Sequence, residues 1–435
     1  MGIKDKALAF GRRFKLDSHH AIERFGVFFG VFALTGAVVI GGSGASALKA
    51  NSDSLSHTAL YTQQFTTSKT SLKGDVDGVY TNEQGSKALV MMHFPANAPI
   101  SYSAADYQAF LLGSDKNLNS QAVETSGIRG SFYVFGSTGY VGVLLDADRP
   151  FAQQVLNLTL RANAELSHDE RKQDKGRADE LAGDASFDKY DQWRVFFNPG
   201  AKETTEIPAL DAVNFDPAQA YYDIVVHKEE ETPRQELDHK LIAMRANLAQ
   251  IQAYTSDLET TKVDGLFLRP PSVPEAIADD AVTGSSASES QDGEATLALE
   301  TEHTVPDGFD FDWREGNVYD GYLDDLVPSG QSYVEFLAKK RAEGSDGVSQ
   351  QISAMQWILS DGSNLRSDYQ SSDVTMRPLT NVMNNLSQAY QSYAKTKSEY
   401  QSDLLLGLLR LDVKLRDVQS NSSVRDDSEV LTTLY

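Results

Sequence analysis

The chain has 435 residues, of which 40% are hydrophobic, so it can bury a sizeable core and is not a wholly disordered protein. Asp and Glu number 62 against 39 Lys and Arg, a formal net charge of −23, which argues against a nucleic-acid partner because phosphate backbones are bound through basic surfaces. Cysteine is absent, which excludes disulfides, thiolate catalysis and zinc–thiolate sites.

The dominant feature of the sequence is an uncharged apolar run over residues 25–48. About 20 apolar residues span the hydrocarbon core of a bilayer, so this run predicts a single N-terminal transmembrane helix. Residues 1–24 form a basic leader with six basic and three acidic residues, whereas the rest of the chain is acidic. Because positive flanks stay in the cytoplasm, we expect a single-pass protein of the cell membrane with a cytoplasmic N-terminus and an extracytoplasmic bulk.

A cleaved signal peptide is the alternative interpretation, since Ala45 and Ala47 have the spacing of a cleavage site that would end at Ala47. The apolar run exceeds the usual length of a signal peptide, which favours a retained anchor. Small residues on one face of this helix would let a second membrane helix approach closely. We therefore expect contacts with membrane lipid and with another envelope or membrane protein or a second copy of the chain. The predicted packing face consists of Gly26, Gly30, Ala33, Ala37, Gly41 and Gly44.

The next part of the chain has the pattern of strands. Residues 49–72 are rich in Ser and Thr and are expected to be a linker. From 73 to 228, short runs rich in Val, Phe and Tyr alternate with polar residues and are separated by turn residues. This pattern predicts an antiparallel β-rich domain, sandwich-like or barrel-like. Residues 167–186 are highly charged and are expected to form an exposed insertion in this domain.

At residue 229 the apolar spacing changes to that of helices. Thr232 and Pro233 form a helix-start signal, and the segment 229–262 then carries apolar residues at steps of three and four. The segment 332–420 contains further helices with the same spacing, which we expect to pack on 229–262 as a long-helix hairpin or coiled-coil bundle. The predicted helix seam consists of Leu237, Leu241, Met244, Leu248, Ile251, Leu258, Leu386, Tyr393, Tyr400, Leu404, Leu411 and Leu415.

The remaining segments are an acidic, partly flexible loop over 263–331 and a tail over 421–435. Acidic and aromatic residues gather in the loop at 307–325. Since Ca²⁺ prefers carboxylate oxygens on turn-rich loops, one hypothesis is a calcium site, although the EF-hand spacing is not matched. The alternatives are aromatic contacts that fix this segment to the protein, or a partner-binding patch with an acidic rim. The calcium candidates are Asp307, Asp310, Asp312 and Glu315.

Catalytic motifs do not stand out in this sequence. No His pair has HExxH spacing, and no nucleophile elbow or P-loop occurs. We therefore expect no cofactor and no enzymatic activity. The α+β chain is interpreted as a membrane-anchored extracytoplasmic structural or interaction protein, a subunit or adaptor of a bacterial cell-envelope assembly of the secretion or conjugation type. An extracytoplasmic ligand-binding receptor and a membrane-tethered hydrolase are the alternatives.

Overall fold

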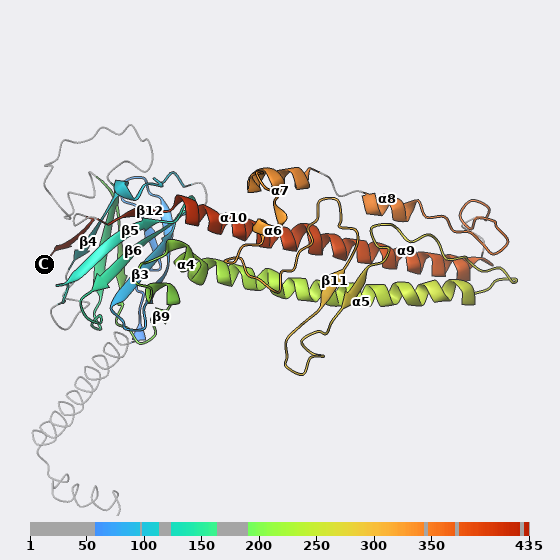
Figure 1. Cartoon of the computed structure of the whole chain (residues 1–435), viewed down its shortest axis with the longest axis horizontal. Helices are drawn as coiled ribbons and strands as arrows, with labels where there is room; N and C mark the ends of the chain where they lie inside the picture. The colour runs from blue at the N-terminus through green and yellow to red at the C-terminus, as the bar shows by residue number, and fades with distance from the viewer. Residues whose placement is uncertain are drawn as a thin grey trace, which may run out of the picture.

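The computed structural model describes residues 57–95, 98–112, 123–162, 190–342, 347–369, 374–426 and 430–434. The predicted leader, the membrane segment with its packing face and cleavage site, and the charged insertion 167–186 lie outside these residues. The described chain forms a β domain at one end and a long two-helix rod that projects from it (Figure 1).

The β domain consists of two sheets that pack face to face around a shared apolar core. One sheet has the order β1-β2-β3-β6-β5-β12 with β9 beside β2, and the other has the order β13-β4-β7-β8. The described strand pairs are antiparallel apart from β2–β9 and β13–β4, which are parallel. The strands are β1 (Gln64–Thr66), β2 (Lys73–Thr81), β3 (Lys87–His93), β4 (Tyr107–Leu112), β5 (Ile128–Val134), β6 (Tyr140–Ala147), β7 (Leu156–Ala162), β8 (Asp191–Phe197), β9 (Thr205–Glu206), β12 (Ser423–Arg425) and β13 (Leu431–Leu434).

The central strand β3 is buried on both faces, which connects the β domain to the rod. Because successive side chains of a strand point to opposite faces, Val90 and Met92 lie between the two sheets. Leu89 and Met91 point the other way and belong to the core at the base of the rod. The β domain and the rod therefore share a continuous hydrophobic contact.

The rod consists of two long antiparallel helical segments. Pro217 at the first helical turn and an Asp216 side chain that accepts a hydrogen bond from the Ala218 N–H start the first segment. Contacts of α5 with α9 and α10 hold the two segments together, and each is about 65 Å long at 1.5 Å per residue. The first comprises α4 (Pro217–Tyr221), the π-helical turn η3 (Tyr222–Val226) and α5 (His227–Thr260), and the second comprises α9 (Arg377–Ser398), the π-helical turn η4 (Glu399–Leu404) and α10 (Leu405–Asn421).

The start of the first long helix differs from the start that the sequence indicates. The helix begins at Pro217, and Pro233 lies inside α5 instead of at its beginning. The reason is tertiary packing, because Tyr221 and Val226 are buried in the base of the rod only when this stretch is helical. Burial of such apolar side chains outweighs the local start signal around Thr232.

The rod is an insertion into the β domain. After α10 the chain returns to the sheets, where β12 pairs with β5 and β13 pairs with β4. The segment that the sequence analysis treats as a tail thus supplies one strand to each sheet. At the other edge, residues 60–62 bond to β8 and β1 pairs with β2, so the expected linker also joins both sheets.

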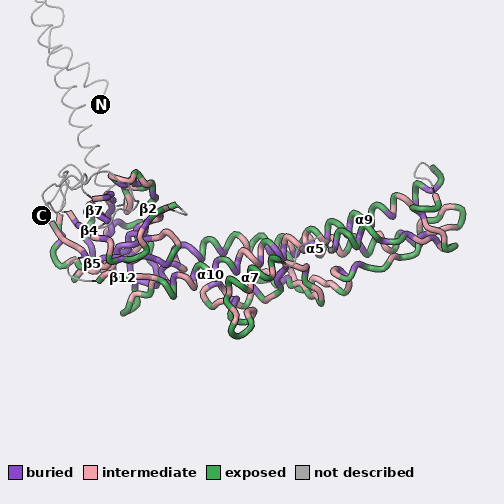
Figure 2. Tube along the Cα trace, turned by 90° about the horizontal axis from the view of Figure 1, so that it is seen from above, coloured by how far each residue is buried: buried purple, intermediate pink, exposed green. Residues whose placement is uncertain are grey.

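Residues 261–376, which we call the strap, run along the rod and contain little regular structure. Its short elements are β10 (Ala281–Thr283), β11 (Ala298–Glu300), α6 (Leu323–Leu326), α7 (Tyr333–Arg341) and α8 (Gly347–Ser353). Buried residues gather inside the β domain and between the rod and the strap, while exposed residues line the outside (Figure 2). The strap thus adds a third layer to the helix pair.

The predicted fold class is wrong, because the sheets are not purely antiparallel. Across the described residues, no helix is long and apolar enough to cross a membrane. The structure is α+β, with antiparallel and mixed sheets and two long helices. The long helices carry one apolar stripe each and polar residues elsewhere, so their length serves packing within the protein.

Candidate functional site

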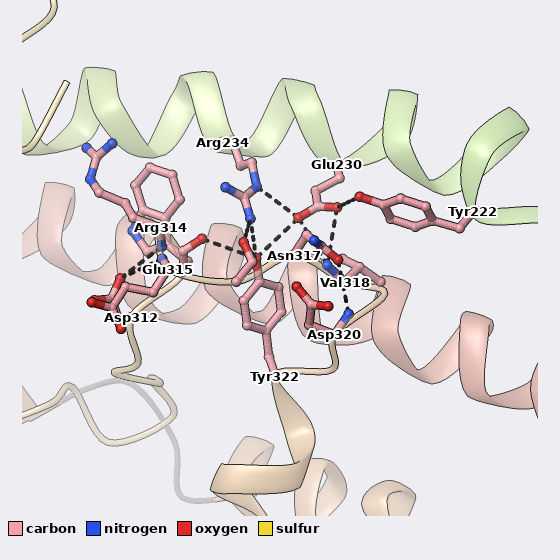
Figure 3. Close-up of polar contacts among 12 residues, drawn as sticks. Tyr222, Glu230, Arg234, Asp312, Arg314, Glu315, Asn317, Val318, Asp320 and Tyr322 are labelled. Atoms are coloured by element: carbon pink, nitrogen blue, oxygen red, sulfur yellow. Dashed lines mark hydrogen bonds and ion pairs between the residues drawn. The ribbon is translucent and has the colours of Figure 1, made fainter. Parts of the chain in front are cut away.

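The most developed polar site of the described chain lies between the rod and the strap and is centred on Glu230 (Figure 3). The Glu230 side chain is 4% exposed, and its carboxylate accepts hydrogen bonds from Arg234 Nε at 2.8 Å and from the Val318 N–H at 3.2 Å. The Tyr322 hydroxyl donates to the same carboxylate at 3.2 Å. Arg234 lies one helical turn after Glu230, so both side chains share one face of α5.

This site attaches the strap to the rod. Arg234 donates to the Gly316 carbonyl and to the Tyr322 hydroxyl, both in the strap. A buried carboxylate is costly unless it is paired and hydrogen-bonded, and here the strap supplies part of the pairing. Burial raises the pKa of Tyr322, and burial together with the Glu230 charge raises the pKa of Tyr222 to about 12, so both phenols keep their protons and donate at neutral pH.

The aromatic residues of the 307–325 segment point into the protein. Trp313 is buried, and its Nε1 donates to the Tyr400 hydroxyl of η4 at 2.9 Å. The guanidinium of Arg314 lies 4.3 Å from the Trp313 ring centroid and donates to Asp238 of α5. A cation over an indole face is a favourable contact. The hydrogen bonds of these two residues join the strap to both long helical segments. The aromatic residues of the segment thus fix it to the rod, one of the three hypotheses that the sequence left open.

The four calcium candidates are dispersed. The Asp307 carboxylate accepts a hydrogen bond from the Ser402 hydroxyl at 2.7 Å, and Asp312 accepts from the Arg314 N–H at 2.9 Å. Asp310 is exposed, and partial desolvation by the surrounding protein raises the pKa of its carboxyl group. Glu315 is joined to Asp312 only through its backbone N–H, which donates to the Asp312 carboxylate. Among the described residues, no group of three or more His, Asp or Glu side chains is arranged to hold a metal ion.

A second polar contact lies near the base of the rod. Asp412 of α10 is buried, and its carboxylate accepts hydrogen bonds from the Leu323 N–H at 2.8 Å and from Arg416 Nε at 2.6 Å. Arg416 also pairs with Asp324 of the strap at 2.8 Å. Burial raises the pKa of Asp412 despite these donors. Burial lowers the pKa of Arg416, but its bonds to the two carboxylates outweigh that effect, and the pKa lies above its usual value.

The predicted seam residues lie where the two long helices and the strap meet. Leu248 and Leu404 are partly buried against this core. The hydroxyls of Tyr393 and Tyr400 bond to strap residues, so these positions contact the strap as well as the opposite helix. The other seam positions are buried in one cluster: Leu237, Leu241, Met244, Ile251, Leu258, Leu386, Leu411 and Leu415.

The buried charged and amide residues of the helices were not recognised from the sequence. Glu230, Lys397, Gln401 and Asp412 are all buried and all bond to the strap. Lys397 and Gln401 are one turn apart, which is the only sequence signal that could have marked them. A polar pair at this spacing normally indicates a solvated face, so the signal is ambiguous without the strap.

Two of the cavities formed by described residues lie along the rod. The first, of about 380 Å³, is lined by Tyr222, His227, Glu230, Glu231, Arg234, Gly316 and Asn317, several of which already bond to one another. The second is a groove of about 670 Å³ lined in part by α8, a helix that lies on the half of the rod away from the β domain (Figure 1). This distal groove is lined by residues 269–275, 351, 354–356 and 358, including three prolines, and its Val273 is 47% exposed.

Comparison with known proteins assigns no relative. No family model matches the chain, and no curated protein or solved structure is detectably similar to it. Function must therefore be inferred from the geometry of the β domain, the rod and the strap.

Proposed function

We propose that this chain is a structural interaction protein that holds two binding surfaces apart, as a subunit or adaptor of a larger assembly. The observation that carries the proposal is the insertion of a long rod between strands of the β domain. Both long helices enter and leave the same sheet region, so the rod cannot pivot about a single connection. A rod of about 65 Å also sets a distance between its two ends.

The contacts at the base support a rigid junction. The Asp417 carboxylate, near the end of α10, accepts hydrogen bonds from the N–H and the hydroxyl of Ser137 in the turn between β5 and β6. Lys240 of α5 pairs with Glu399 of η4 at 2.6 Å farther along the rod. Together with the shared core of Leu89 and Met91, these contacts favour one orientation of the rod on the β domain.

The distal groove is the surface that we propose for a partner. Its proline-rich wall and Val273 leave apolar area exposed at the end of the rod. Placement in a bacterial cell-envelope assembly, of the secretion or conjugation type, is part of the proposal and rests on the sequence alone: its apolar run over residues 25–48, its acidity and its lack of cysteine. Nothing in the proposal requires catalysis or a cofactor.

Site-specific photo-crosslinking in intact cells tests the proposal. A photoreactive amino acid would replace Val273 in the distal groove, Tyr102 on the β domain or Ala246 in the middle of α5, all exposed positions. We expect protein adducts of defined mass from the first two positions and none from Ala246. Absence of adducts at both ends, or equal adducts at all three positions, would contradict a two-ended spacer.

The rigidity of the spacer can be measured separately. Because the chain has no cysteine, Cys can be introduced at the exposed positions Lys202 and Glu259 for spin labelling without removing native thiols. Lys202 lies in the β domain and Glu259 at the far end of α5. A single narrow distribution of distances between the labels is expected. A broad distribution would show that the rod swings on the β domain.

A further inference from the structure

The most deeply buried ion pair of the described chain joins α9 to the strap. The side chain of Lys397 is 1% exposed and that of Asp280 is 0% exposed. Lys397 Nζ lies 3.0 Å from Oδ1 and 2.7 Å from Oδ2 of Asp280. Of the ion pairs among described residues, this pair alone is dehydrated on both sides; Lys240 and Glu399, by comparison, are each about one-third exposed.

The surroundings of this pair hold the nitrogen against the carboxyl group. Nζ also donates toward the carbonyl oxygens of Ala276 and His303, both at 2.7 Å, and toward the Thr301 hydroxyl at 2.9 Å. The Tyr393 hydroxyl donates to Asp280 Oδ2 at 2.7 Å. Five acceptor oxygens thus surround three ammonium protons, and both reacting groups are fixed by contacts on several sides.

We propose that Lys397 and Asp280 condense to an intramolecular isopeptide bond that crosslinks the rod to the strap. In this step Nζ forms a bond to Cγ of Asp280, the bond from Cγ to one carboxyl oxygen breaks, and one water leaves. No atom is oxidised or reduced, so the reaction needs no oxidant, metal or cofactor.

The reaction requires the neutral amine and the neutral acid, which form when the ammonium passes one proton to the carboxylate oxygen 2.7 Å away. Burial without water disfavours the charged form of an amine. Burial lowers the pKa of Lys397, although the Asp280 charge opposes this effect. Effective molarities for well-oriented intramolecular reactions are very high, which compensates for the poor reactivity of a carboxyl group.

The remaining proton has a short path between the reacting groups. As the C–N bond forms, the nitrogen loses a second proton, which must reach the departing hydroxyl so that water leaves. Nζ lies 3.0 Å from Oδ1 and 2.7 Å from Oδ2, so this proton can pass directly to the departing oxygen. The Tyr393 hydroxyl contacts one carboxyl oxygen, where its hydrogen bond stabilises the charge that develops on that oxygen. Tyr393 is thus the positioning residue of this site. The amide N–H that remains can still donate to one of the neighbouring carbonyls.

The crosslink would stabilise this protein as a disulfide stabilises others, by restricting the unfolded chain. The protein has no cysteine, so it cannot form a disulfide. The strap has little regular structure and is attached to the rod through side-chain contacts. A covalent bond between Asp280 and Lys397 closes a loop of more than one hundred residues, and closing a long loop restricts the unfolded chain.

Mass spectrometry of the full-length purified protein tests this proposal without any variant. After complete denaturation, the intact mass is expected to be lower than the sequence mass by one water. Proteolysis should give one branched peptide in which the segment around Asp280 is joined to the segment around Lys397. A denatured protein of full sequence mass, with separate linear peptides for these two segments, would overturn the proposal.

Variants assign the water loss to this pair. Lys397→Ala and Asp280→Ala should restore the full mass, whereas Lys240→Ala, which removes the exposed pair with Glu399, should keep the water loss. Tyr393→Phe keeps the ring and should lower the crosslinked fraction severalfold at early times after synthesis of the chain. A water loss that persists in Lys397→Ala would overturn the assignment, and an unchanged rate in Tyr393→Phe would remove that hydroxyl from the reaction.

Discussion

Asp417 and Ser137 are joined by two hydrogen bonds at the junction between the rod and the β domain. Asp417 Oδ2 accepts from the Ser137 N–H at 2.6 Å and from the Ser137 hydroxyl at 2.8 Å. The neighbouring Gly136 has a φ of 55°, and a Cβ at that position would lie 2.5 Å from the same carboxylate oxygen. The turn between β5 and β6 therefore packs closely against the end of α10.

Replacement of Asp417 should weaken this junction. We expect Asp417→Ala to lower the free energy of unfolding by about 1–3 kcal/mol, because hydrogen bonds to a charged group are worth that much. Urea denaturation of the full chain measures the loss. Asp403→Ala, an exposed carboxylate in η4, is the control and should change stability little. Equal effects of the two substitutions would show that the junction is held by apolar contacts alone.

Loss of the Glu230 carboxylate should release part of the strap. Glu230→Ala leaves Arg234 without its carboxylate partner and the Val318 N–H without its acceptor, so we expect a loss of about 3 kcal/mol. Tyr322→Phe removes one donor and should cost about 1 kcal/mol. Hydrogen exchange of the Val318 amide is the direct measurement. If it exchanges equally slowly in Glu230→Ala and in the unchanged protein, the cluster does not hold the strap.

The apolar stripe of α5 gives a prediction with a neighbouring control. Leu241 is 0% exposed between the long helices, whereas the next residue, Ile242, is 41% exposed. Leu241→Ala should destabilise the protein by about 2–5 kcal/mol through lost burial and a cavity. Ile242→Ala should cost less than about 1 kcal/mol. Thermal unfolding of both variants separates the buried position from the exposed one, and similar melting temperatures would contradict the helix orientation.

Acid should detach the β10–β11 region from α5. Hydrogen bonds from Arg245, then from Ser286, lower the pKa of Glu289 to about 2, below the value near 4.3 of an unfolded Glu. Because the folded pKa is depressed, this contact stabilises the protein above about pH 4.5 and is lost as the pH falls through about 2. Limited pepsin digestion at pH 4 and pH 2 should show cleavage in this region only at the lower pH. Arg245→Gln should be cleaved at both pH values.

The apolar faces of the long helices could be predicted from the sequence, because they depend only on the spacing of nearby residues. Leu237, Leu241 and Leu415 recur at helical steps, and the structure buries all three. The start of the first helix could not be derived in this way. Pro217 is followed by the run AYYDIVV, which is rich in β-branched and aromatic residues and therefore has the pattern of a strand. That run is helical because Tyr221 and Val226 pack on the rod base, a tertiary effect that exceeds intrinsic propensity.

The polar contacts between rod and strap could not be derived from the sequence. Glu230 accepts a hydrogen bond from Val318, and Lys397 pairs with Asp280, although the partners are many tens of residues apart in the sequence. The strap offers no periodic pattern, so its path along the rod follows from side-chain contacts that act only in the folded state. For the same reason the pairing of β13 with β4 was not anticipated, since short C-terminal strands carry a weak pattern and take their place from their partner.

The position of β12 and β13 has a consequence for how the protein is made. Val134 of β5 and Ala109 of β4 are synthesised before the rod, yet their partners Ser423 and Leu431 are synthesised after it. Until then both sheets have an unpaired edge, and such edges are prone to associate with other chains. Pairing of segments so distant in sequence is slow, so completion of the β domain must wait until the whole rod and the strap have been synthesised. A nascent chain that ends before residue 423 would therefore carry two sheets that each lack an edge strand.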